Sequence, residues 1–88
     1  MTIEELRSKI DVVDDELKKL FLERMEIAHE IGALKANTGD TVYKPDREKA
    51  VIERLTDGVD ESVKEEYTKF VTYVIQLSRE HQKKMLEK

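Results

Sequence analysis

The sequence has no cysteine, so no disulfide framework can stabilise the fold. Its single proline is Pro45, so residues 1–44 contain no proline that would break a helix. No run of apolar residues approaches the length of a membrane span. These absences predict a protein that does not enter a membrane and that is free to form long helices.

The charge balance argues against a nucleic-acid-binding protein. Charged residues make up 41% of the chain, but the net charge is −4. A chain without a basic excess is not expected to bind nucleic acid, and any anion must bind in a local pocket against the overall field. The first residues, MTIEELRSKI, contain acids and lack the apolar region of a signal peptide. We therefore expect a cytoplasmic location.

Several catalytic arrangements are missing as well. The two histidines, His29 and His81, fall on different predicted helices and so lack metal-ligand spacing. We expect His81 to lie at a helix surface or core edge. The sequence has no glycine-rich phosphate loop and no recognisable pair of nucleophile and base. It therefore predicts no metal site and no cofactor.

The dominant pattern present is a long apolar seam over residues 2–36. Thr2 and Glu5 have the spacing of a capping box, and residues 37–40 (NTGD) read as a stop. The pattern predicts a helix of about 34 residues, or about 50 Å. Its apolar positions are three or four apart, or seven across the break at residue 24: Ile3, Leu6, Ile10, Val13, Leu17, Leu20, Ile27, Ile31 and Leu34.

This helix is too long to bury its seam against its own chain. An 88-residue chain buries only about 60–65% of its unfolded surface, so a helical monomer would be marginal. Oligomerisation is the usual remedy when disulfides are absent. The sequence therefore predicts a homodimer that shares the long helix.

Two further helices follow. Pro45 suits the first turn of a helix over about residues 45–57, which Gly58 ends. Either Asp60 or Ser62 caps the third helix; Ser62 and Glu65 have capping-box spacing. The third helix has two adjacent apolar seams and should touch neighbours on two sides. We predict one all-α domain, residues 1–88, with a long, a short and a long helix.

One position breaks the first seam: Arg24 stands where an apolar residue is expected. Such an arginine usually extends its charge to water, but a core position is costly without a partner. Lys35 lies within about 20° of the same face, about 16 Å along the axis. Arg7 is about 25 Å from Arg24. Two long helices packed antiparallel in a dimer would bring Arg7 of one chain to Arg24 of the other.

Other polar residues have equally plain readings. Ser78 and Gln82 are in line with an apolar seam of the third helix and can be core groups bonded to backbone. Arg47 can be a solvated charge, as can Arg7 and Lys35 taken singly. Glu48 can simply favour the positive end of its helix.

Together these residues form a recognisable set. The chain resembles the all-helical (AroQ-type) chorismate mutases over nearly its full length. The matching stretches are LRSKIDVVDDELKKLFLERMEIAHEIGALK, PDREKAVIERL and FVTYVIQLSREHQ. The residues that carry the resemblance, in order, are Arg7, Arg24, Lys35, Arg47, Glu48, Ser78 and Gln82.

The resemblance implies an intertwined homodimer that converts chorismate to prephenate on the route to phenylalanine and tyrosine. It implies that Arg7, entering from the partner, holds one substrate carboxylate and that Arg24 holds the other. Ser78 and Arg47 would help around the carboxylates.

The same resemblance assigns the remaining contacts. Lys35 would contact a carboxylate and the ether oxygen, and Gln82 would donate to that oxygen. Glu48 would bind the ring hydroxyl. Where some members have an acid four positions before this glutamate, this chain has Lys44, so the hydroxyl contact would depend more heavily on Glu48.

Two other functions stay open. Isochorismate-pyruvate lyases share this helical fold and differ in pocket detail. A non-catalytic helical dimerisation or regulatory module is the third reading, and it predicts that Arg24 is replaceable by leucine without functional loss.

Overall fold

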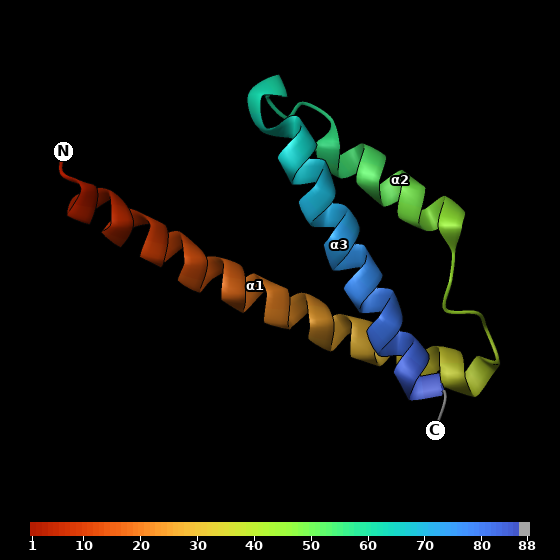
Figure 1. Cartoon of the computed structure of the whole chain (residues 1–88). Helices are drawn as coiled ribbons and strands as arrows, with labels where there is room; N and C mark the ends of the chain where they lie inside the picture. Colours follow the sequence, from red (N-terminus) through yellow and green to blue (C-terminus); the bar gives the residue numbers. More distant parts are fainter. Residues whose placement is uncertain (87–88) are drawn as a thin grey trace.

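The computed structural model describes residues 1–86 and contains three helices (Figure 1). They are α1 (Ile3–Thr38), α2 (Pro45–Thr56) and α3 (Glu61–Leu86). The described residues contain no strand. The predicted all-α class, with helices in the order long, short, long, is confirmed.

The ends of α1 follow from local chemistry. The hydroxyl of Thr2 accepts a hydrogen bond from the backbone N–H of Glu5 at 3.2 Å, which confirms the predicted cap. At the other end, Gly39 adopts φ 74° and its N–H donates to the carbonyl of Lys35 at 2.9 Å. A left-handed residue is easiest for glycine, so the helix ends there, two residues later than predicted.

The boundaries of the other helices correct one prediction. Pro45 begins α2 as expected. The carboxylate of Asp60 accepts from the N–H of Ser62 at 3.0 Å, so Asp60 caps α3 and Ser62 lies inside it. The alternative capping box of Ser62 and Glu65 is therefore wrong, because the shorter reach from Asp60 satisfies the first amides.

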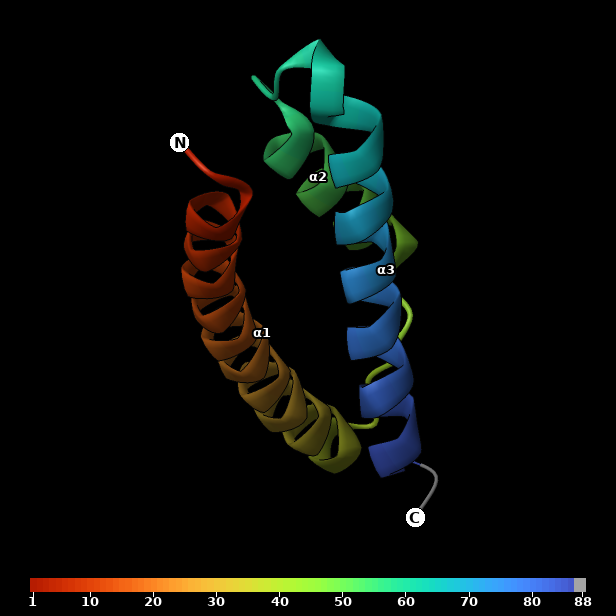
Figure 2. The ribbon, with the colours of Figure 1, turned by 60° about the vertical axis from the view of Figure 1, so that its left-hand side comes forward.

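The third helix lies between the other two. It contacts α1 and α2, whereas α1 and α2 do not contact each other in the described residues. The expected packing of this helix on two sides is confirmed. The two views together show that α3 approaches only the C-terminal half of α1, while the N-terminal half projects away (Figures 1 and 2). The molecule is correspondingly elongated, at 54 × 25 × 15 Å.

The buried core is small and sits along α3. Its apolar members are Ala28, Val51, Val71 and Ile75. Gly32 is also buried, and a Cβ there would lie 3.4 Å from the Cα of Gln82. Small residues on α1 therefore let the backbone of α3 come close at the position where polar side chains are found.

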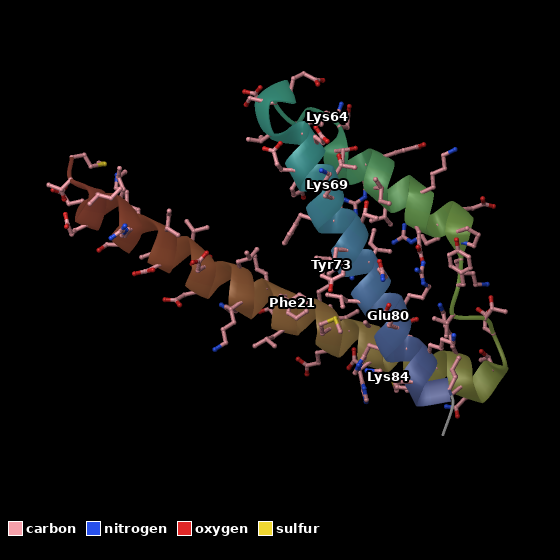
Figure 3. All side chains as sticks on the ribbon, in the orientation of Figure 1. Phe21, Lys64, Lys69, Tyr73, Glu80 and Lys84 are labelled. Carbon is pink, nitrogen blue, oxygen red and sulfur yellow. The ribbon has the colours of Figure 1, made fainter. Side chains whose placement is uncertain are left out.

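The long apolar seam is uncovered within this chain. Each of its nine members, from Ile3 to Leu34, is between 41% and 66% exposed. Every residue from 1 to 20 is exposed, and Phe21 is the first that is half-buried, near the approach of α3 (Figure 3). The face that meets α3 is a neighbouring one, which contains Ala28 and Gly32. A single chain thus leaves the seam available, as its length predicted.

Candidate active site

An open pocket of about 380 Å³ lies where α1, α3 and the start of α2 meet. Its apolar walls include Ala28, Val51 and Ile75. Six of the seven residues singled out in the sequence line it: Arg24, Lys35, Arg47, Glu48, Ser78 and Gln82. Residues from all three helices, far apart in sequence, therefore converge on one hollow.

Arg24 and Ser78 form the contact between α1 and α3 on one side of the pocket. Arg24 Nη1 donates to Ser78 Oγ at 2.5 Å, and Ser78 Oγ donates to the carbonyl of Val74 at 3.1 Å. Ser78 is buried, so both capacities of its hydroxyl are used where water has little access. This arrangement orients the guanidinium while leaving its other N–H groups for a ligand.

Lys35 and Gln82 form a second contact. Lys35 Nζ lies 3.4 Å from Gln82 Oε1 and 3.4 Å from the carbonyl oxygen of Val42. Gln82 is only 8% exposed. Since its oxygen accepts from Lys35, the amide N–H groups of Gln82 are left to donate to something else in the pocket.

Glu48 has a partner that the sequence reading missed. Arg79 Nη1 donates to Glu48 Oε1 at 2.7 Å, and Arg79 also lines the pocket. Arg79 follows Ser78 directly and precedes Gln82 by three residues, so it lies beside the same face of α3. This position beside two predicted pocket residues was the sequence signal that could have identified Arg79. Arg47 lines the pocket as well, but it is exposed.

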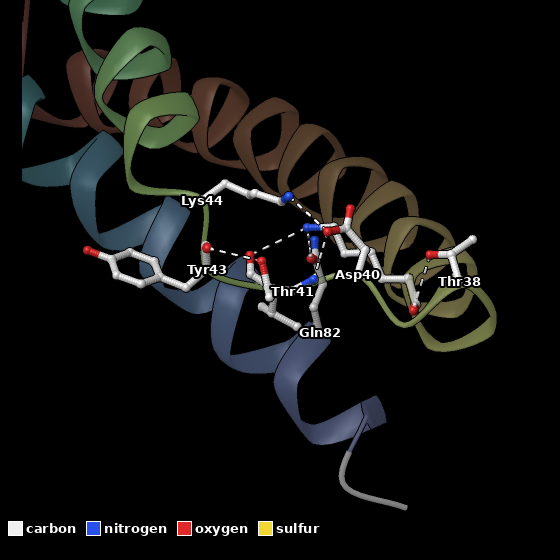
Figure 4. Close-up of polar contacts among 8 residues, drawn as sticks. Thr38, Asp40, Thr41, Tyr43, Lys44 and Gln82 are labelled. Carbon is white, nitrogen blue, oxygen red and sulfur yellow. Dashed lines mark hydrogen bonds and ion pairs between the residues drawn. The ribbon is translucent and has the colours of Figure 1, made fainter.

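Lys44, the departure noted in the sequence, turns to another residue. Its Nζ lies 2.8 Å from Asp40 Oδ1, and the N–H of Thr41 donates to the same oxygen at 2.8 Å (Figure 4). The hydrogen bonds from Lys44 and Thr41 hold the pKa of the Asp40 carboxyl below its usual range. Lys44 thus lines the pocket, but its charge is paired with Asp40 and not with Glu48.

Arg7 is the predicted residue that does not join the others in this chain. It is exposed, lies on the projecting half of α1 and does not line the pocket. Its contribution to a partner's site stays a prediction.

The two histidines, placed on separate helices by the sequence, meet in the fold. His29 Nδ1 lies 3.4 Å from His81 Nε2, and the ring centroids are 5.6 Å apart. They belong to different helices, as the sequence indicated, and they meet because α1 and α3 pack against each other at this point. Within residues 1–86, no cluster of three or more His, Cys, Asp or Glu side chains is arranged to hold a metal ion.

The pocket is strongly cationic for an acidic protein. Among residues 1–86, its lining has one carboxylate, Glu48, and five cationic side chains: Arg24, Lys35, Lys44, Arg47 and Arg79. Arginine binds carboxylates through parallel hydrogen bonds. The arrangement suits a small anion with more than one carboxylate and one hydroxyl or other donor.

The comparison with known families agrees with this geometry. Residues 6–83 match the family model described as chorismate mutase type II. The chain belongs to this family. The matched range of this chorismate mutase type II chain includes Arg7 and all six pocket residues predicted from the sequence.

Three related proteins were compared with this chain, and two of them have chorismate mutase in their names. A bifunctional chorismate mutase/prephenate dehydratase of Neisseria gonorrhoeae is 48% identical over 60 residues, 64% of this chain and 16% of that protein. The T-protein of Haemophilus influenzae is 39% identical over 51 residues, 58% of this chain and 14% of that protein. The chorismate mutase of Methanocaldococcus jannaschii is 35% identical over 51 residues, 58% of this chain and 52% of that protein.

The matches with the first two relatives therefore span about a sixth or less of those proteins, and the match with the third spans about half. No solved structure matches the chain significantly. None of the described helices combines the length and apolarity needed to cross a bilayer.

Proposed function

We propose that this protein is a chorismate mutase that rearranges chorismate to prephenate. The observation that supports this most directly is the convergence of Arg24, Lys35 and Gln82 on one pocket of about 380 Å³. Chorismate carries two carboxylates, an ether bridge and a ring hydroxyl, and the pocket offers cations, an amide donor and one carboxylate. The proposal treats residues 1–88 as a single mutase domain acting in the cytoplasm.

The reaction needs what this pocket can supply. A Claisen rearrangement is intramolecular and proceeds without a nucleophile, a metal or an obligatory proton transfer. The protein must hold the flexible substrate in its reactive chair, which is an orientational task. It must also aim donors at the ether oxygen, where negative charge develops as the bond breaks.

The proposed roles follow the contacts. Arg24, oriented by Ser78, holds one carboxylate, and Arg47 at the exposed mouth supports the charged end of the substrate. Lys35 and the free N–H groups of Gln82 face the ether oxygen. Glu48 accepts from the ring hydroxyl.

The proposed enzyme is an intertwined homodimer. The apolar seam of α1 covers its counterpart in a second copy, and the partner's Arg7 binds the second carboxylate beside Arg24. The exposure of the whole seam supports this, because isolated apolar stripes of this extent mark protein interfaces.

The test is direct conversion. Purified protein is mixed with chorismate, and prephenate is followed by its acid conversion to phenylpyruvate. We expect conversion by the wild type and background rates from a Gln82→Ala variant that retains its helical circular dichroism. A folded wild type that leaves chorismate unchanged would overturn the proposal, as would release of pyruvate from isochorismate as the faster reaction.

A further inference from the structure

Arg79 joins three segments at the wall of the pocket. From α3 its Nη1 reaches Glu48 Oε1 on α2 at 2.7 Å. Its guanidinium carbon lies 4.7 Å from the ring centroid of Tyr43, in the connection between α1 and α2. One side chain therefore links α3, α2 and the connecting segment.

This ion pair differs from the others in the described residues. The remaining pairs are three or four residues apart in sequence, whereas Arg79 and Glu48 belong to different helices. Their side chains are 31% and 21% exposed, compared with 76% and 79% for Lys69 and Glu65. Partial burial reduces solvent screening, and the aromatic face adds a cation–π contact.

We propose that Arg79 is a positioning residue that sets the orientation of Glu48 for the substrate's ring hydroxyl. This inference depends on the proposed function. Arg79 donates to Oε1 of Glu48, and the proposal assigns the other carboxylate oxygen, Oε2, to the ring hydroxyl. Tyr43 limits the movement of the guanidinium on its other side.

Lys44 does not compete for this task. Its ammonium is 2.8 Å from Asp40, and Figure 4 shows it extending to the side of the connection opposite the Tyr43 ring. Within residues 1–86, Arg79 is the cation that forms an ion pair with Glu48. The missing acid at position 44 makes this single carboxylate the acceptor at the hydroxyl end of the pocket.

The experiment compares two substrates: chorismate and an analogue without the ring hydroxyl. The variants are Arg79→Met, Arg79→Lys, Glu48→Gln and the double variant Glu48→Gln/Arg79→Met. Arg54→Met is the matched control, since Arg54 is exposed on α2 and is not part of the pocket lining. Circular dichroism and thermal midpoints are recorded for each.

We expect Arg79→Met to lower kcat/KM for chorismate about tenfold and for the analogue less than about twofold, because the hydroxyl contact is what Arg79 supports. Arg79→Lys restores part of the loss by keeping the charge. In the Glu48→Gln background, Arg79→Met costs no more than about twofold, the mark of two residues acting as a unit.

Equal losses on the two substrates would overturn the proposal and make Arg79 structural. Additive losses in the double variant, or no loss on chorismate, would overturn it as well. If Arg79→Met fails to fold, the comparison of the two substrates with Arg79→Lys decides in the same way. A wild type inactive on chorismate would instead overturn the proposed function, and this inference with it.

Discussion

Two regions of the molecule, the exposed seam of α1 and the junction of α1 with α3, reverse the usual relation between polarity and burial. Over residues 3–20, the apolar seam is exposed along its whole length. At the junction with α3, by contrast, the polar residues Ser78 and Gln82 are buried and the cation Arg24 is half-buried. The first region lacks a partner that a second chain can provide, and the second lacks a ligand that a small anion can provide.

Arg7 connects the two regions. It lies on the N-terminal half of α1 beside the seam, and it is a cation like Arg24 at the junction. If the seam is an interface, Arg7 is carried with it into a partner's pocket. The proposed account is that the exposed seam of α1 assembles the dimer and that the neighbouring face of α1, which meets α3, holds the substrate. Its consequences can be separated experimentally.

The largest effect is expected for Arg24→Leu, which makes the junction apolar like the seam. Loss of a cation that binds the reacting molecule should lower kcat/KM by about 1000-fold or more. Removal of a half-buried charge should leave the thermal midpoint unchanged or raised, because Ser78 keeps its bond to Val74. Steady-state kinetics and thermal unfolding measure both. An unchanged kcat/KM would contradict the assignment of Arg24 to the reacting molecule.

The next effect concerns the seam. Ile10→Glu places a carboxylate on the proposed interface and should dissociate the dimer, with a thermal midpoint lowered by more than about 10 °C. Val12→Glu is the control: Val12 is 62% exposed against 58% for Ile10, but it lies about 130° from the mean direction of the seam residues between 3 and 20. Sedimentation velocity measures assembly. Equal behaviour of the two variants would contradict the seam as the interface.

A smaller effect is expected where the backbones meet at the junction. In Gly32→Ala the new Cβ would lie 2.8 Å from Met85 Sδ and 3.4 Å from Gln82 Cα. Met85 can turn aside, but the backbone of α3 cannot. We expect kcat/KM to fall about fivefold through displaced Gln82, while the gain of about 1 kcal/mol in helix propensity offsets crowding. Adding Met85→Ala should not restore activity; full recovery would limit the effect to the thioether.

The smallest effect is expected at Asp40. Its pKa is lowered in the folded state, so its contribution to stability is present above its ordinary value of 3.8 and is lost as the pH falls through the lowered value. The ion pair of Asp40 with Lys44 is exposed. Wild type and Asp40→Asn should therefore differ by at most about 2 °C in thermal midpoint at pH 7. The two curves should converge below pH 3.8. A gap that widens with acidity would contradict the sign.

Much of this architecture followed from the sequence because its signals are local. The cap at Thr2, the end near Gly39 and the start at Pro45 depend on residues within one turn. The six pocket residues were found because each is a polar group in an apolar pattern or part of a family's spacing.

The missed features depend on how helices cross. The pairing of Arg79 with Glu48 joins residues 31 apart, and the His29–His81 contact joins residues 52 apart. Contacts between residues so far apart leave no periodic pattern in the sequence, so the sequence could not reveal them. Likewise, Arg24 was read as a defect of the exposed seam, whereas it begins the neighbouring face that meets α3.

Complementation between two inactive variants tests the central claim, that the seam carries Arg7 into a partner's junction, most directly. Arg7→Ala and Arg24→Ala are purified separately, then unfolded together and refolded as an equal mixture. Half of the dimers should be mixed, and each should hold one site with both arginines, so activity should return to about a quarter of the wild-type value. A mixture as inactive as its two components, although sedimentation shows mixed dimers, would contradict the account.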